Sequence, residues 1–392
     1  MCRIGCIFWR QNMPASRKMA VILICSAACA GVLWIWSYYA RQPSVITIKI
    51  GALLPASNGD LAENRKMMIR GMELAKEFID AKYKGQVNLD FDYQNGCFAK
   101  ESIPAVQKFS HDNVPIIAAS FCLFGHLPIL PITEGNKIIT FNTAANPDEA
   151  LNLKYAFSTN VEVKDEAQRL SQFACNQLGA KRAVTMFLDT PFGHDYDKYF
   201  TYDFNHCGGD VVGSFPNAPD GKQFKSIISQ IKLLKPDIII TAHFGLPLAM
   251  FIKEVRQAKI KAPILGNYET EDPTVINYAG DAAEGVMFSS SELNEKTPIM
   301  KDFKRRYIRK FGAEPNELVT NVYDDVLLSV DSYLACNNDR DCMANYLHQI
   351  SNYQGVSGTI TINPSGATNK PTIFKMIKNH TFIPYPKYQV KE

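Results

Sequence analysis

The chain has 392 residues, of which 42 are basic, 39 are acidic and 46% are hydrophobic. Five of the basic residues and none of the acidic ones lie in residues 1–41, so the rest of the chain carries a net charge of −2. This balance argues against binding to a nucleic-acid backbone, and the composition excludes a disordered chain or a multi-pass membrane protein. About 350 residues follow the N-terminal segment, which is more than one compact core usually holds, so two lobes are expected.

Residues 19–40 are an uncharged, largely apolar run, and Arg10, Arg17 and Lys18 precede it. As a helix this run would span about 33 Å, enough to cross a hydrocarbon core of about 30 Å. The basic residues before it predict that residues 1–18 stay in the cytoplasm and that the body is exported. The expected location is the periplasmic or cell-surface face of a bacterial inner membrane. An uncleaved anchor, a cleaved signal and a lipoprotein signal ending at Cys29 remain alternatives.

Strand and helix patterns alternate after residue 44. Alternating branched apolar residues predict strands, and apolar residues at helical spacing, such as Met68, Met72 and Ala75, predict amphipathic helices. The strands expected in this first series are 45–55, 87–93, 114–119 and 137–142, and the helices are 65–83, 100–111 and 127–135.

A second series of the same kind begins after residue 160. Its expected strands are 183–188, 210–215, 237–242 and 263–266, and its helices are 164–178, 195–205, 222–234 and 247–258. Such regular alternation predicts an α/β fold with two doubly wound lobes, each a parallel sheet covered by helices on both faces.

The remaining elements are too few for a third domain. They are helices 297–311 and 317–336 and strands 359–363 and 372–377. They are expected to complete sheets already begun, so that lobe one comprises 45–160 with about 291–365 and lobe two comprises 161–290 with about 366–392. Two such lobes leave a cleft at the carboxyl ends of their strands, where open α/β sheets bind ligands.

Enzyme signatures are missing from the sequence. It has no phosphate-binding loop, dinucleotide fingerprint, nucleophile elbow or HExxH motif. The seven histidines are scattered, and none is paired with another at a spacing of four. The sequence therefore predicts a protein that is not an enzyme, with no catalytic residue, metal or cofactor; a hydrolase is the weakest hypothesis.

Aromatic residues and glycines recur at the ends of predicted strands. Phe121 follows one strand, Phe192-Gly193 and Phe244-Gly245 follow two others, and Tyr268 follows another. Aromatic side chains at the carboxyl ends of parallel strands are well placed to stack on a ligand and orient it.

Several motifs together resemble a known family. They are IKIGALLPASNGDLA from Ile48, then Asn146-Pro147-Asp148, Asp189-Thr190-Pro191-Phe192-Gly193 and Ala279-Gly280-Asp281-Ala282-Ala283-Glu284-Gly285. From about residue 46 to 385 the chain resembles type 1 periplasmic substrate-binding proteins, such as the leucine/isoleucine/valine-binding proteins of ABC transporters. The resemblance implies two Rossmann-like lobes joined by three crossovers and closing on a small-molecule ligand.

Cysteine usage agrees with export. Six cysteines follow the apolar segment, and an even number in an oxidising compartment suggests disulfide bonds. The resemblance implies a bridge between Cys97 and Cys122. The simplest remaining pairs are then Cys175 with Cys207 and Cys336 with Cys342.

The departures from the family pattern bear on specificity. Leu123 stands where amino-acid binders typically have a serine that grips the ligand carboxylate, and Ala145 replaces a threonine. Phe192 and Phe244 replace tyrosines. Tyr268 takes the place of an acidic residue that receives the ligand ammonium, and Glu269 follows it. A cleft without these groups would pair the charges of a zwitterion poorly, which favours a less polar, aromatic or monocarboxylate ligand over a standard amino acid.

Each candidate residue has an expected role in that site. Phe192, Phe244 and Tyr268 would stack on the ligand, with Phe121 contributing to the same surface. Thr143 and the backbone around Cys122 and Leu123 would hydrogen-bond to the ligand, and Glu269 or Asp324 would meet any positive group. The leading hypothesis is a solute-binding protein that delivers its ligand to an ABC-type permease. The alternative is a membrane-tethered sensory or assembly module of the same fold that binds a protein partner.

Overall fold

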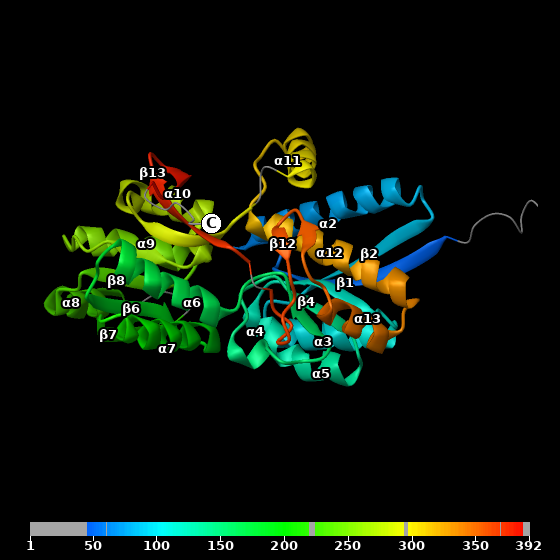
Figure 1. Ribbon diagram of the computed structural model, residues 1–392, viewed down its shortest axis with the longest axis horizontal. Helices are drawn as coiled ribbons and strands as arrows, with labels where there is room; N and C mark the ends of the chain where they lie inside the picture. Colours follow the sequence, from blue (N-terminus) through cyan, green and yellow to red (C-terminus); the bar gives the residue numbers. More distant parts are fainter. Residues whose placement is uncertain (1–44, 60, 219–223, 294–296, 369, 387–392) are drawn as a thin grey trace, which may run out of the picture. The chain divides into compact units, whose positions relative to one another are not determined.

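The computed structural model describes residues 45–59, 61–218, 224–293, 297–368 and 370–386 (Figure 1). The apolar segment at residues 19–40 lies outside the described residues. Within them, residues 45–47 with 79–88 form one compact unit, and 48–78 with 89–386 form another. In the first unit, the end of helix α2 (Ala62–Lys82) leads into β2, and the amide of Ile46 donates to the carbonyl of Gln86 at 2.9 Å.

The first sheet has five strands in the order β2-β1-β3-β4-β5. They are β1 (Ile46–Leu54), β2 (Val87–Asn95), β3 (Ile116–Ser120), β4 (Ile139–Asn142) and β5 (Ala156–Ser158). The pairs β1–β3, β3–β4 and β4–β5 are parallel. Every residue of β3 and β4 is buried, as expected for inner strands covered on both faces. The helical elements between these strands are α3 (Ala99–His111), α4 (Leu123–His126), η1 (Leu127–Ile129), α5 (Leu130–Gly135) and η2 (Asp148–Ala150).

The second sheet has seven strands in the order β14-β13-β10-β9-β8-β6-β7. They are β6 (Arg182–Leu188), β7 (Asp210–Asn217), β8 (Ile238–Ala242), β9 (Ile264–Gly266), β10 (Met287–Ser291), β13 (Thr372–Lys378) and β14 (Thr381–Pro384). Strands β6 to β10 pair in parallel, and β13 and β14 add an antiparallel edge. Its helical elements are α6 (Val163–Gln172), η3 (Phe173–Gln177), α7 (Pro191–His206), α8 (Phe224–Leu234), α9 (Gly245–Gln257), η4 (Tyr268–Thr270), α10 (Pro273–Ala279) and η5 (Gly280–Ala283).

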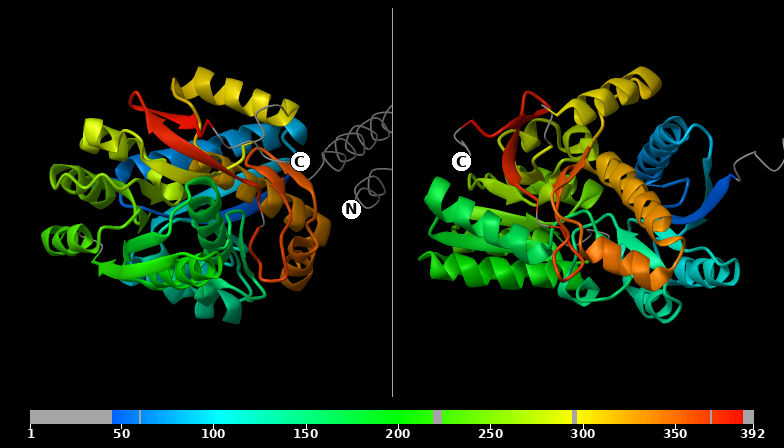
Figure 2. Two further views of the ribbon diagram at one scale, coloured as in Figure 1. Left: turned by 60° about the vertical axis from the view of Figure 1, so that its left-hand side comes forward. Right: turned by 45° about the vertical axis from the view of Figure 1, so that its right-hand side comes forward.

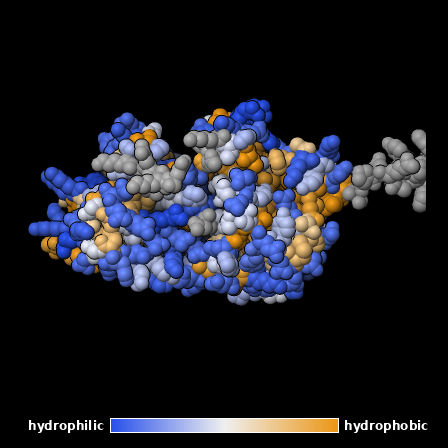
Figure 3. All heavy atoms as spheres, in the orientation of Figure 1, coloured by the Kyte–Doolittle hydropathy of each residue, from blue (hydrophilic) through white to orange (hydrophobic). Residues whose placement is uncertain are grey.

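Apolar side chains of β8 face both sides of the second sheet. Ile238, Ile240 and Ala242 belong to one core cluster, and Ile239 belongs to another. Because successive side chains of a strand point to opposite faces, an uninterrupted apolar run is what a strand buried on both faces needs. On the face visible in Figure 3, hydrophilic residues predominate and hydrophobic ones form smaller groups between them.

The last third of the chain adds helices to the first sheet and strands to the second, whereas the strand expected at 359–363 lies in a separate hairpin and completes neither sheet. After β10 come α11 (Pro298–Phe311), α12 (Glu317–Cys336), α13 (Arg340–His348) and the hairpin of β11 (Tyr353–Gly355) and β12 (Gly358–Ile360). Helix α12 packs against β3 and α13 against β4, so these late helices cover the first sheet (Figures 1 and 2). The chain then returns to the second sheet to form β13 and β14.

Helix α7 begins earlier than the periodicity of its apolar residues indicates. The sequence predicts residues 195–205, whereas the helix starts at Pro191, because Thr190 caps it and accepts a hydrogen bond from the amide of Gly193 at 3.3 Å. A Cβ atom on Gly193 would lie 1.9 Å from the carbonyl oxygen of Leu188, so only glycine fits this close turn. The turn brings Phe192 directly beside the end of β6.

Candidate functional site

Three disulfide bonds join the six described cysteines: Cys97–Cys122, Cys175–Cys207 and Cys336–Cys342. Their Cα atoms lie 4.7, 6.4 and 5.6 Å apart, respectively. These are the pairs expected from the sequence. The first bond ties the turn after β2 to the turn after β3, where several candidate ligand residues lie.

The candidate residues of the first sheet follow its inner strands. Phe121, Cys122 and Leu123 come after β3 and are partly buried, and Thr143 comes after β4 and is buried. The carbonyl of Cys122 already accepts from the amides of α4, and the hydroxyl of Thr143 donates to the carbonyl of Ser120 at 3.3 Å. Any ligand hydrogen bond at Thr143 would therefore use the hydroxyl oxygen as an acceptor.

The candidate aromatic residues of the second sheet gather at one apolar cluster. Phe192 is 3% exposed and belongs to this cluster, making an edge contact with Tyr196 at 4.9 Å between ring centroids. Phe244, Tyr268 and Leu123 are partly buried and pack against the same cluster. The structure thus brings four candidates from four separate strand ends onto one cluster.

Tyr268 is held by hydrogen bonds at both ends of the residue. Its backbone amide donates to Glu166 Oε1 at 2.8 Å. Its hydroxyl donates to Glu269 Oε1 at 3.3 Å and accepts from the backbone amide of Ala145 at 3.1 Å. Since Ala145 follows β4 and Tyr268 follows β9, this side chain connects the strand ends of the two sheets.

Glu166 is a site residue that sequence reasoning missed. It is 2% exposed, and its Oε1 also accepts from the hydroxyl of Ser289. An acidic residue in the first turn of a helix, here α6, is normally a solvated residue that favours the helix dipole, so the sequence carries no signal for its burial. The burial of Glu166 becomes evident only in the tertiary structure, where α6 packs against β10 and Glu166 binds the amide of Tyr268 in η4.

The two buried carboxyl groups beside Tyr268 hold protons unusually tightly. Burial raises the pKa of Glu166 to about 8, and the negative charges of Glu317 and Glu269 add to this rise. Burial also raises the pKa of Glu269 to about 7. Within the described part of the chain, the Oε2 atoms of both residues are buried without a hydrogen-bond partner. Such atoms are free to bind a donor group.

Two buried hydroxyl groups lie near Gly266, at the end of β9. Thr241, in β8, and Thr270, in η4, are fully buried, and neither hydroxyl has a hydrogen-bond partner among the described residues. A Cβ on Gly266 would lie 2.1 Å from Thr270 Oγ1 and 3.0 Å from Thr241 Oγ1, so glycine at the end of β9 makes room for both. The strand ends of the second sheet therefore carry further polar groups in a buried setting.

Asp324 does not join this site. It lies on α12, is fully buried, and its carboxylate accepts from the amides of Val356 and Ser357 at 3.0 and 2.7 Å and from the Ser357 hydroxyl at 2.6 Å. Its neighbour Asp325 accepts from the hydroxyl of Thr159 at 2.7 Å. The expectation that Asp324, as an alternative to Glu269, meets a positive group of the ligand is thus corrected: its carboxylate is bound by the segment after β11, and Asp325 is bound by Thr159.

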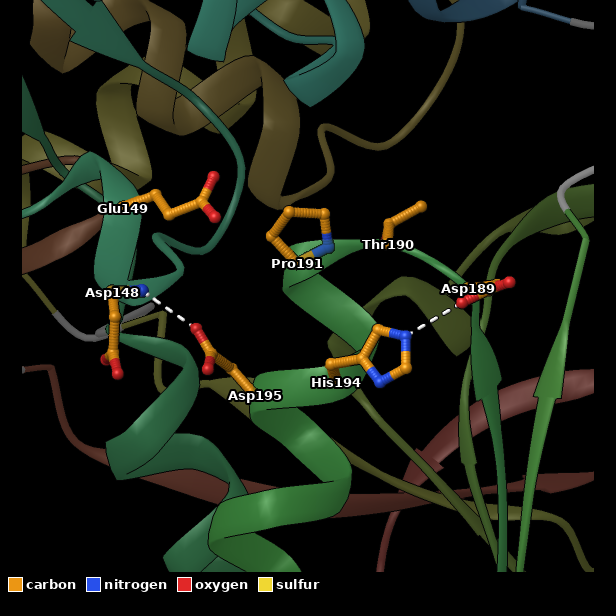
Figure 4. A pocket seen from close by; sticks show the side chains of 7 residues that line it. All are labelled: Asp148, Glu149, Asp189, Thr190, Pro191, His194 and Asp195. Carbon is orange, nitrogen blue, oxygen red and sulfur yellow. Dashed lines mark hydrogen bonds and ion pairs between the residues drawn. The ribbon is translucent and has the colours of Figure 1, made fainter.

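An open hollow of about 520 Å³ lies at the start of α7, and its lining is acidic. Figure 4 shows Asp148 and Glu149, from η2, opposite Pro191, His194 and Asp195 of α7. The amide of Asp148 donates to Asp195 Oδ2 at 2.9 Å. Despite these carboxylates, no group of three potential metal ligands was found in the described ranges.

The comparisons with known proteins agree with this architecture. The family model described as periplasmic binding protein matches residues 47–379. The chain belongs to this family. It is a type 1 periplasmic binding protein of the kind that serves ABC transporters, which implies a periplasmic or extracellular location and a small-molecule ligand.

Individual relatives are distant but cover most of the chain. A Leu/Ile/Val-binding protein of Citrobacter freundii is 20% identical over 80% of this chain and 86% of its own length. A leucine-binding protein, LivK, of Thermotoga maritima has a similar structure, with a TM-score of 0.80, 24% identity, and coverage of 86% of this chain and 97% of its own. A solute-binding protein of R. palustris in complex with 4-hydroxybenzoate has a TM-score of 0.77 and 19% identity, covering 86% and 95% of the two chains.

The membrane segment expected from the sequence lies outside the described residues. Among the helices that the structure does describe, none combines the length and apolar character that a membrane crossing requires.

Proposed function

We propose that the chain captures a small solute with an apolar or aromatic body and a hydrogen-bond-donating polar end, and delivers it to an ABC-type permease. In this proposal the five-stranded and seven-stranded sheets are the cores of two Rossmann-like lobes, lobe one and lobe two, joined by three crossovers. The solute binds at their strand ends without covalent chemistry. The N-terminal apolar segment exports the body and either anchors it or is removed.

The observation that carries this proposal is the pair of carboxyl groups beside Tyr268. Each offers a buried oxygen without a partner, and the charges that act on them, from Glu317 and Asp272, are also negative. A donor group of the solute would satisfy these oxygens, while an anion would be repelled once they ionise. Leu123, Phe192 and Phe244 lie at the same apolar cluster as Tyr268 and supply the apolar surface of the proposed site.

A second ligand class, aromatic carboxylates, is favoured by proteins of similar structure. Solute-binding proteins of R. palustris in complex with benzoate and 4-hydroxybenzoate have TM-scores of 0.73 and 0.77 to this chain. Below the pKa values of Glu166 and Glu269 both carboxyl groups are neutral, and a protonated carboxyl group can donate a hydrogen bond to a carboxylate.

The two classes predict opposite pH dependences. As pH rises from 6 to 9, Glu269 and then Glu166 lose their protons, so affinity for an amine-bearing solute rises and affinity for a carboxylate falls. A thermal-shift panel of aromatic amines, amides, amino acids and benzoates on residues 42–392 identifies a ligand. Titration calorimetry at pH 6 and 9 then shows whether the affinity for that ligand rises or falls with pH. Affinity for an amine that weakens over this range contradicts the first assignment. A panel without any stabilising ligand contradicts solute capture of either class.

A further inference from the structure

Two sets of hydrogen bonds connect the lobes directly, one buried and one exposed, and both end in the loop that follows β4. We propose that Tyr268 and the Asp148 clasp, defined here as Asp148 with Asp195, Lys198 and Tyr199, form a built-in latch that favours the closed conformation before a solute binds.

Tyr268 forms the buried half of this latch. Its hydroxyl accepts from the amide of Ala145, which is fully buried in the loop after β4. Glu269 accepts a hydrogen bond from that hydroxyl, and Glu166 accepts one from the Tyr268 amide, so the residue is held at both its side chain and its backbone. A backbone donor at the end of a lobe-one strand is a group that a solute could use, and here a side chain of lobe two uses it.

The Asp148 clasp forms the exposed half. The amide of Asp148 donates to Asp195 Oδ2 at 2.9 Å. The Oδ2 atom of Asp148 accepts from Lys198 Nζ at 2.9 Å and from the Tyr199 hydroxyl at 2.6 Å. All three partners lie on α7 of lobe two, and Asp195 also lines the hollow shown in Figure 4. Asp148 lies three residues after Ala145, so both halves hold the same short segment.

This arrangement makes Tyr268 a specificity-determining residue as well as a latch. This consequence rests on the proposed function, since it concerns solute binding at the same strand ends. The Ala145 amide is already hydrogen-bonded inside the protein, so an acceptor group of the solute at that position would add little affinity. A donor group that reaches Glu269 would add more. Closure before binding would also require a solute to wait for opening, which slows association.

Hydrogen exchange at single amides tests the latch on the full chain without added solute. In Tyr268→Phe, protection of the Ala145 amide falls because its partner is lost. If the bridge holds the lobes closed, protection of the Asp148 amide also falls, by about two- to tenfold, although its own partner is untouched. Tyr196→Phe is the matched control, because its hydroxyl is buried in the same apolar cluster without a hydrogen-bond partner among the described residues.

A second variant, Asp195→Ala, tests the latch from the other half, so that the result does not depend on Tyr268→Phe alone. In Asp195→Ala, the Asp148 amide loses its acceptor, and protection at Ala145 falls too if the halves act together. Unchanged Asp148 protection in Tyr268→Phe, with the amides of β8 still protected, overturns the proposal. If Tyr268→Phe loses the protection of β8, that variant has unfolded and Asp195→Ala decides the test. Unchanged Ala145 protection in Asp195→Ala then overturns the proposal. Since no solute is added, neither result depends on the ligand class.

Discussion

Removal of the Cys97–Cys122 bond should destabilise the protein by an amount set by the loop that it closes. The two cysteines lie 25 positions apart, and the entropy lost by the unfolded chain on closing such a loop corresponds to about 3.5 kcal/mol at 25 °C. The paired substitution Cys97→Ser with Cys122→Ser removes the bond and leaves no free thiol at either position. The free energy of unfolding should fall by about that amount.

The Cys336–Cys342 bond provides an internal control of the loop-length argument. Its cysteines are only 6 positions apart, so Cys336→Ser with Cys342→Ser should cost about 2.3 kcal/mol. Urea titrations followed by circular dichroism, under oxidising conditions, give both values. We expect the first pair to exceed the second by about 1 kcal/mol.

Two results would refute this reasoning. One is a cost below about 1 kcal/mol for the first pair, which is too small for a formed bond that closes this loop. The other is alkylation of both Cys97 and Cys122 in the folded, unreduced protein. A larger cost for the second pair would instead show that local packing at the end of α12, rather than loop entropy, determines these energies.

Four further substitutions test polar groups, three of them buried or partly buried and one exposed. Lys370 is 1% exposed, donates to Asn321 Oδ1 at 2.7 Å and Ser357 Oγ at 2.8 Å, and lies in the field of the buried carboxyl groups of Asp324 and Asp325. Lys370→Met would leave these groups without a compensating charge, so it should cost about 3–5 kcal/mol in urea titration. Lys137→Met, at an exposed ion pair with Asp341, should cost at most about 1 kcal/mol; equal costs would contradict the difference in burial. The pKa of Glu166 is raised to about 8, so between pH 5 and 8 this residue is protonated in the folded protein and ionised in the unfolded chain, and stability falls by about 1.4 kcal/mol per pH unit. Glu166→Gln should remove this part of the decline. An equal decline in both proteins would contradict a raised pKa at Glu166. Tyr268→Ala should weaken solute binding at least tenfold in calorimetry without unfolding the protein, and undiminished affinity would remove Tyr268 from the site.

The fold could be read from the sequence because it depends on local patterns repeated many times. The uninterrupted apolar run of β8 predicts a strand buried on both faces, and the structure places its side chains in two core clusters. The prediction that the tail completes earlier sheets is confirmed for β13, which pairs with β10. It is wrong for the strand expected at 359–363, because β12 pairs with β11 in a separate two-stranded sheet. The sequence analysis did not predict β5, β10 and β11, each of three to five residues, although it did predict equally short strands with branched apolar runs, such as β8.

The candidate site was only partly predictable. Aromatic residues after strands predicted Phe192, Phe244 and Tyr268 as ligand contacts, and the structure brings these three side chains to one apolar cluster, because the carboxyl ends of parallel strands meet at one edge of a sheet. Glu166 and Asp324 show the limit of that reasoning. Both are acidic residues on helices, where exposure to water is the usual state, and nothing in their local sequence distinguishes a solvated carboxylate from a buried one.

By itself, the sequence determined the α/β class, the order of the elements, the cysteine pairs and the surface where a ligand is expected, since these follow from periodicity, from turn residues and from resemblance to a family. Only the tertiary structure decided what each polar side chain does there. In it, Glu166 accepts a hydrogen bond from the Tyr268 amide, and the Tyr268 hydroxyl accepts one from the amide of Ala145. Asp324 is buried on α12 and accepts a hydrogen bond from the amide of Ser357. Burial and hydrogen bonding depend on partners that are distant in sequence, and these contacts set the charge and availability of each group.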